Sequence, residues 1–162
     1  MKPALLIIDM QKMFYENETK KMMDEASEYI NAAVDFFRSK NYPIVWIQHS
    51  EPEDGLVAGS DGFEWIPPLR PQVDDIHIVK TYGNAFTKTT LKAILDEKGV
   101  DTVILSGYCA EYCVLNTCRG AVDVDLTSIL LRGSLASGMR ENIKFVESIN
   151  NIISYGAMIK IL

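Results

Sequence analysis

The feature that most constrains this fold is a strand–turn–helix pattern in residues 100–120. Residues 102–106, with the sequence TVILS, form a short apolar run bounded by a glycine on each side. A continuous run of this length and β-branched content is typical of a strand that is buried on both faces. A polar turn follows, and residues 113–119, CVLNTCR, have helical spacing. We therefore expect a buried strand that leads directly into a helix.

Cys113 is predicted to lie in the first turn of that helix. The unpaired N–H groups and the helix dipole at this position favour a thiolate, the nucleophilic form of cysteine. Most free cysteines are instead small buried hydrophobic residues, so both roles stay open at this point. The other cysteines, Cys109 and Cys118, give a C-x3-C-x4-C pattern, which is not the spacing of a zinc site.

Strand-like and helix-like segments alternate along the rest of the chain. Strands are predicted at residues 2–10, 43–48, 75–80, 102–106, 126–131 and 156–162. Helices are predicted at residues 19–40, 87–98, 113–119 and 139–154. Residues 51–75 are rich in glycine and proline and are predicted to form a long loop. This alternation predicts one α/β domain over residues 1–162, with three α/β/α layers around a parallel sheet.

Three reactive side chains stand at predicted carboxyl ends of strands: Asp9, Lys80 and Cys113. Each has a structural interpretation, since an acid there often caps a loop and a lysine is often solvated. Ligands of parallel sheets bind outside the carboxyl ends of the strands, where the strand order reverses. Together the three residues provide a nucleophile, an acid/base and a cation for one site.

Composition narrows the classes of partner. The chain has 162 residues, a net charge of −6 and no basic block, so nucleic acids and anionic membranes are not expected as partners. The N-terminal apolar run ends at Asp9, which makes it too short for a signal sequence or a membrane span. A cytoplasmic location is the resulting expectation.

Three segments resemble the isochorismatase-like cysteine hydrolases, a superfamily that includes nicotinamidases and N-carbamoylsarcosine amidohydrolases. They are residues 6–11 (LIIDMQ) with Phe14, residues 80–87 (KTYGNAFT), and residues 99–107 (GVDTVILSG) followed by Cys113. The resemblance covers nearly the whole chain as a single domain. It implies a Rossmann-like, six-stranded parallel sheet with the order 3-2-1-4-5-6.

The same resemblance implies a catalytic triad of Asp9, Lys80 and Cys113. It also implies a cis peptide between Tyr108 and Cys109, and an oxyanion hole made by the backbone N–H groups of Cys109 and Cys113. With this strand order Lys80 starts two strands away from Asp9, roughly 10 Å at the usual strand spacing. Its side chain must therefore lean across the intervening strand.

The chain also departs from the family. Residues 110–111 are Ala-Glu where the family often has Thr-Asp, and residues 133–134 are Gly-Ser where it often has Asp-Ala. Nicotinamidases bind a metal after the second strand through an aspartate and histidines, but residues 48–51 here read QHSE. Zinc sites require about three protein ligands. We therefore expect no metal and no other cofactor.

Five residues are candidates for a pocket that holds a flat or apolar small-molecule substrate. They are Phe14, His49, Trp65, Tyr108 and Tyr112. The aromatic members can equally belong to the core or to a subunit contact.

A homodimer or larger homo-oligomer is expected, partly because many relatives assemble. The loop at residues 51–75 also carries apolar side chains that we expect a monomer to leave exposed. These are Leu56, Val57, Phe63, Trp65, Ile66 and Leu69.

The implied function is hydrolysis of a small amide or related C–N bond through a thioacyl-enzyme intermediate. Two alternatives stay open. One is a vinyl-ether hydrolase of the isochorismatase type, which does not need the cysteine. The other is a non-catalytic thiol sensor or scaffold, in which Cys109 or Cys118 would pair with Cys113.

Overall fold

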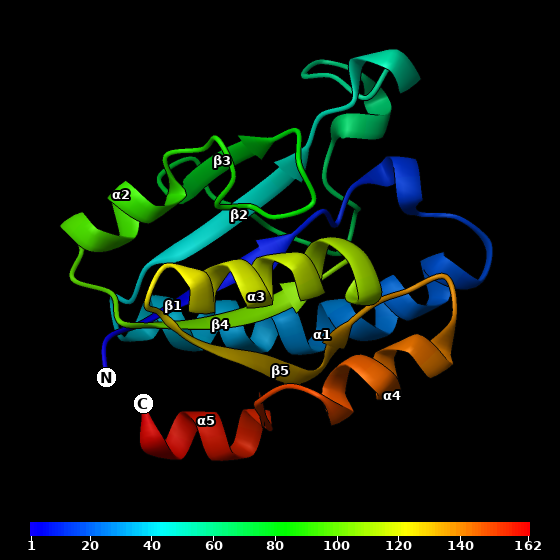
Figure 1. Cartoon of the computed structure of the whole chain (residues 1–162). Coiled ribbons are helices and arrows are strands. Elements are labelled where there is room, and N and C mark those ends of the chain that lie inside the picture. Colours follow the sequence, from blue (N-terminus) through cyan, green and yellow to red (C-terminus); the bar gives the residue numbers. More distant parts are fainter.

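A six-stranded, all-parallel sheet forms the centre of the computed structural model, which describes all 162 residues. The strands are β1 (Pro3–Ile8), β2 (Ile44–His49), β3 (Ile76–Lys80), β4 (Thr102–Gly107), β5 (Thr127–Leu135) and β6 (Ile152–Ile153). Their order is β3-β2-β1-β4-β5-β6, which confirms the predicted order (Figure 1). The chain therefore reverses its direction of winding between β1 and β4, which lie side by side at the centre.

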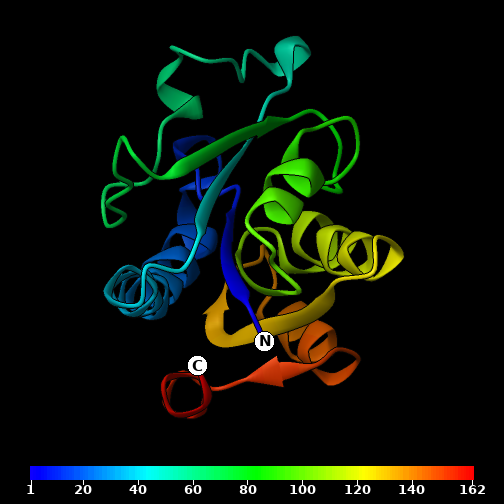
Figure 2. The same ribbon diagram turned by 90° about the vertical axis from the view of Figure 1, so that its left-hand side faces the viewer.

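Helices cover both faces of the sheet and confirm the three-layer prediction (Figure 2). They are α1 (Asn17–Ser39), α2 (Leu91–Glu97), α3 (Leu115–Asp123), α4 (Arg140–Ser148) and α5 (Tyr155–Ile161). Strand β1 is completely buried, and its side chains alternate between the two cores. Leu6 and Ile8 face the core beneath α2 and α3, whereas Leu5 and Ile7 face the core beneath α1. No helix of the chain is both long enough and apolar enough to cross a bilayer.

The C-terminal segment was predicted to be a strand over residues 156–162, and this prediction is wrong. The segment forms α5, and the sixth strand is the short pair Ile152–Ile153. The predicted helix over residues 139–154 accordingly stops at Ser148. The Ser154 side chain accepts a hydrogen bond from the Ala157 N–H and caps α5, a local signal that outweighs the apolar composition of the segment. Short apolar runs do not distinguish strand from helix by periodicity alone.

The loop between β2 and β3 does not present the apolar surface that was expected of it. Leu56, Phe63, Ile66 and Leu69 are buried within the chain. The loop reaches this burial by folding back onto the segment after β1, where the Ile66 N–H donates to the Met10 carbonyl. The argument for an oligomer from an exposed loop is therefore wrong, and assembly stays a prediction from the family resemblance.

Candidate active site

The carboxyl ends of three strands bring together the three reactive residues that the sequence singled out. Asp9 follows β1 directly and has a φ of 51°, a left-handed conformation that aspartate tolerates better than most residues. Lys80 is the last residue of β3, and Cys113 lies in a π-helical turn, η4 (Ala110–Val114), shortly after β4. Cys113 therefore lies in the opening turn of a helical segment that continues directly into α3 (Leu115–Asp123), as predicted, but this turn is π-helical rather than α-helical. π-Helical turns are frequent at functional sites.

The Lys80 side chain joins the other two residues. Its Nζ lies 2.7 Å from Asp9 Oδ2 and donates a hydrogen bond to Cys113 Sγ at 3.4 Å. Residue 80 pairs with His49 in the sheet, so its side chain must extend across the end of β2 to reach Asp9. The whole lysine side chain is buried. The Lys80 side chain therefore crosses the intervening strand β2 to reach Asp9, as the strand order requires.

Burial dominates the electrostatics of the site. Burial raises the pKa of Asp9 above its ordinary value, although the Lys80 ammonium opposes this shift. Asp9 Oδ1 is buried and forms no hydrogen bond, so it is free to accept a proton from the neighbouring thiol. Burial, and then the Asp9 charge, raise the pKa of the Cys113 thiol to about 12, against the smaller opposing effect of Lys80. This raised pKa opposes the thiolate that the helix position favours, and Asp9 lies where it can act as the base when Cys113 attacks a substrate carbonyl.

In the turn between β4 and Cys113, the backbone passes very close to the end of β1. Gly107 has a φ of 115°, and a Cβ at this position would collide with the backbone of Ile8. The Tyr108 N–H donates to the Ile8 carbonyl at 2.8 Å, and the peptide between Tyr108 and Cys109 is cis, as the resemblance implied. The Cys109 N–H has no hydrogen-bond partner within the protein, so it can donate to an oxyanion.

Glu111 anchors this turn to the segment after β5, a contact that the sequence did not reveal. Ser137 Oγ donates to both of its carboxylate oxygens, at 3.0 and 2.8 Å, and Asn142 Nδ2 donates to Oε1 at 2.7 Å. Burial opposes the charge, but hydrogen bonds from Cys109, Ser137 and Asn142 hold the pKa of Glu111 below its ordinary value. The only sequence signal was the departure from the family pattern at residues 110–111.

Gln11 is a second residue whose role the sequence did not reveal. Its side chain is completely buried, and its Oε1 accepts a hydrogen bond from the His49 N–H at 2.8 Å. Its Nε2 donates to the His49 carbonyl at 3.0 Å and to the Phe63 carbonyl at 3.1 Å. The amide thus extends the pairing of β1 and β2 beyond Asp9 and fixes the backbone of His49.

His49 was expected to line the pocket, and its ring contacts Lys80. Its Nδ1 lies 3.1 Å from Lys80 Nζ, and its Nε2 lies 3.9 Å from Glu51 Oε2. Burial and the Lys80 charge lower the pKa of His49, which favours the neutral ring. The other histidine, His77, contacts the Gln72 carbonyl instead. No three metal-binding side chains gather anywhere in the chain, so these residues do not fit the metal site of the nicotinamidases.

The four aromatic pocket candidates occupy different surroundings. Phe14 and Tyr108 stack with ring centroids 5.0 Å apart, beside the turn that leads to Cys113. Trp65 packs edge-to-face on Trp46 at 5.2 Å, against the core beneath α1. Tyr112 is 66% exposed. Phe14, Trp65 and Tyr108 therefore all pack against the core beneath α1, and Tyr108 also directly precedes the turn that leads to Cys113.

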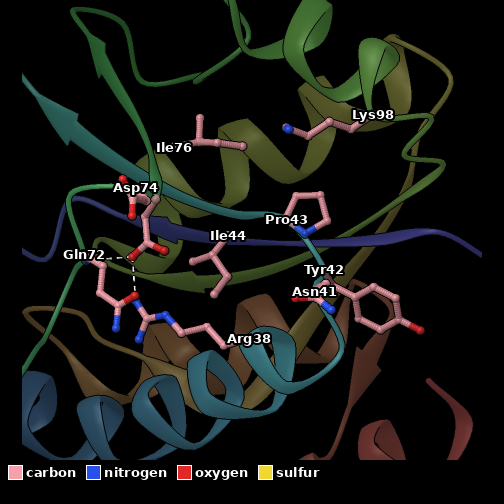
Figure 3. A pocket seen from close by; sticks show the side chains of 10 residues that line it. Arg38, Asn41, Tyr42, Pro43, Ile44, Gln72, Asp74, Ile76 and Lys98 are labelled. Carbon is pink, nitrogen blue, oxygen red and sulfur yellow. Dashed lines mark hydrogen bonds and ion pairs between the residues drawn. The ribbon is translucent and has the colours of Figure 1, made fainter.

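One cavity lies at the opposite end of the sheet (Figure 3). It has a volume of about 440 Å³ at the amino ends of β2 and β3, where its lining includes Arg38, Ile44 and Ile76. Asp75, also in its wall, accepts hydrogen bonds from Arg38 Nη2 at 2.6 Å and from Trp46 Nε1 at 2.7 Å. These contacts tie the loop to α1 and β2, and none of the reactive residues lies there.

Comparison with known proteins agrees with this geometry. The isochorismatase domain model matches residues 3–157. The uncharacterised isochorismatase family protein YrdC of Bacillus subtilis is 27% identical over 86% of this chain and 77% of its own length. The crystal structure of an isochorismatase-like hydrolase from Alkaliphilus metalliredigens superposes with a TM-score of 0.89 at 25% identity, over 99% of this chain and 98% of that one. N-carbamoylsarcosine amidase from Thermoplasma acidophilum superposes with a TM-score of 0.83 at 25% identity, over 95% and 96% of the two chains.

Proposed function

Because this chain belongs to the isochorismatase family of hydrolases, we propose that it cleaves a small-molecule amide or related C–N bond with Cys113 as the nucleophile. The observation that carries the proposal is the single buried ammonium of Lys80, which contacts both the Asp9 carboxylate and the Cys113 thiol. The similarity to an amidase that acts on N-carbamoylsarcosine supports the bond class.

The first step is attack by the thiol. Asp9 accepts the Cys113 proton as Sγ bonds to the substrate carbonyl carbon. The thiol is a weak acid here, with its pKa raised to about 12, and the same burial raises the pKa of Asp9. A more basic carboxylate is a better acceptor for this proton. The Lys80 ammonium stabilises the negative charge that develops on sulfur.

The remaining steps reuse the same groups. The backbone N–H groups of Cys109 and Cys113 donate to the oxyanion of the tetrahedral intermediate. Asp9 returns its proton to the leaving nitrogen, the C–N bond breaks and a thioester remains on Cys113. Asp9 then takes a proton from water, and the resulting hydroxide adds to the thioester carbonyl. The C–S bond breaks, Asp9 returns its proton to Cys113 Sγ, and the acid product is released.

The two alternatives make different demands on Cys113. A vinyl-ether hydrolase does not need a thiol, so it would retain activity without Cys113. A thiol sensor needs a second cysteine, but Cys118 Sγ is buried and receives a hydrogen bond from Ser128 at 3.0 Å. The Cys109 thiol is also buried and contacts Glu111, so neither offers an open partner.

The test is a screen of small amides, ureides and N-carbamoyl compounds, read by ammonia release. With an active substrate, Cys113→Ala is expected to reduce kcat at least about a thousandfold, as loss of a nucleophile does in other hydrolases. Cys118→Ala is the matched control and should keep wild-type activity, since this thiol lies away from the reacting groups. Hydrolysis of the substrate by Cys113→Ala at the wild-type rate would contradict the proposal.

A further inference from the structure

We propose that His49 is a positioning residue that holds the Lys80 ammonium against Asp9 and Cys113 by accepting the third ammonium proton. The inference rests on the proposed function, because it assigns His49 a part in activating Cys113. It differs from both roles considered so far, a wall of the substrate pocket and a metal ligand.

The Lys80 ammonium carries three protons, and each needs an acceptor. An ammonium has three N–H donors and no acceptor. Three acceptors surround Nζ: Asp9 Oδ2 at 2.7 Å, His49 Nδ1 at 3.1 Å and Cys113 Sγ at 3.4 Å. The lysine side chain is completely buried, so water is not an alternative acceptor. Each proton therefore has one partner, and His49 supplies one of the three.

This contact fixes the chemical form of His49. Because Lys80 can only donate, Nδ1 must carry the lone pair, and the proton of the neutral ring lies on Nε2. Nε2 faces Glu51 Oε2 at 3.9 Å, which suits a donor. Gln11 holds the backbone of His49 through two hydrogen bonds, so the ring projects from a fixed point.

Without His49 Nδ1 as an acceptor, the hydrogen bond from Lys80 Nζ to Cys113 Sγ would weaken. A buried ammonium proton without a partner is costly, so Nζ would move toward other acceptors. Sulfur is the weakest acceptor of the three, so the contact with Cys113 is the one most readily lost. Since the Lys80 charge opposes the rise in the pKa of Cys113, its departure would make the thiol still less reactive.

Acid should have the same effect. The charged groups that face His49 are Lys80 on β3, Asp9 after β1 and Glu51 after β2. Protonation of Nδ1 would set an N–H against the ammonium at 3.1 Å, so the contact with Lys80 must break. Burial and the Lys80 charge lower the pKa of His49, so this protonation requires a more acidic solution than an ordinary histidine does.

The test compares His49→Asn with His49→Leu. The asparagine amide oxygen can accept in place of Nδ1 and does not titrate, whereas leucine cannot accept. The readout is the rate of iodoacetamide alkylation of Cys113, measured by mass spectrometry, with buried Cys109 as internal reference. We expect alkylation of Cys113 about tenfold slower in His49→Leu, the scale of a lost hydrogen bond to a charged group, and little changed in His49→Asn.

The same alkylation is then measured at several pH values, as the ratio of the wild-type rate to the His49→Asn rate. The titration of the Cys113 thiol affects both rates and cancels in this ratio. This ratio should fall as the solution is acidified through the pKa of His49. Three results would each overturn the inference. The ratio could stay constant with pH, Cys113 in His49→Leu could be alkylated at the wild-type rate, or alkylation in His49→Asn could be as slow as in His49→Leu. If His49→Leu does not fold, the pH dependence of the ratio decides by itself. Alkylation needs no substrate, so the result is independent of whether an amide is ever hydrolysed.

Discussion

The ion pair of Lys80 and Asp9 should contribute to the free energy of unfolding, and this contribution can be measured without a substrate. Its atoms lie 2.7 Å apart, and both side chains are almost completely buried. Lys80→Met keeps much of the buried volume but leaves the Asp9 carboxyl without its cation. Breaking a buried ion pair in this way costs about 3–5 kcal/mol, and we expect a loss of this size near neutral pH.

The loss should depend on pH with a definite sign. Burial already raises the pKa of Asp9 in the folded protein, and removal of Lys80 raises it further. A carboxyl whose folded-state pKa is raised stabilises the fold below its unfolded pKa, and this stability is lost as pH rises through the folded pKa. The extra cost of Lys80→Met should therefore grow with pH, by at most about 1.4 kcal/mol per pH unit.

The assay is urea unfolding followed by circular dichroism at about pH 5 and about pH 8, both above the ordinary pKa of an aspartate. The control adds Asp9→Asn, because asparagine tolerates the left-handed backbone at this position and carries no charge. The double variant should be more stable than Lys80→Met alone by about 1–3 kcal/mol at the higher pH. Equal losses at both pH values, or a double variant less stable than Lys80→Met, would refute the reasoning.

Two further predictions concern single substitutions near Cys113. Asp9→Asn should abolish hydrolysis, because the leaving nitrogen then receives no proton. It should accelerate iodoacetamide alkylation of Cys113, which depends only on the thiolate population, because the carboxylate charge raises the pKa of that thiol. The alkylation rate should rise about threefold for each unit by which the pKa of Cys113 falls, because a less basic thiolate is more abundant but also less nucleophilic. Slower alkylation in Asp9→Asn would contradict this prediction. Gly107→Ala should destabilise the protein by about 3 kcal/mol or more in chemical denaturation, because its Cβ would meet the last carbonyl of β1 at a φ of 115°. Gly156→Ala, in the exposed helix α5 with open space around it, is the control and should be neutral or slightly stabilising.

The sequence by itself determined the layer architecture and the edge of the sheet that carries the site. Alternating apolar runs and helical periods predict a parallel sheet between two layers of helices. Asp9 and Lys80 could be assigned to carboxyl ends of strands from the ends of their apolar runs, and Cys113 from its place in the helical segment that follows the next strand. The strand order came from the resemblance to a family, since local patterns do not specify which strands are neighbours.

Tertiary structure decided the contacts that join distant segments. Glu111 meets Ser137 and Asn142 only after β4 and β5 lie side by side, and Gln11 meets His49 only after β1 and β2 do. No sequence period reports a hydrogen bond between residues that lie 26 or more positions apart. The burial of apolar side chains in the loop between β2 and β3 has the same origin, because the surface that covers them belongs to other segments.

The acidity of Cys113 depends on the tertiary structure more than on its local position in the chain. A position near the start of a helix favours a thiolate, and the sequence shows that position only approximately. The pKa depends instead on how much water reaches the sulfur and on the net effect of Asp9 and Lys80, which oppose each other. Both quantities are set by the packing of three strand ends around one buried ammonium. Desolvation and charge act through space, so the sequence named these groups but only the fold fixed their balance.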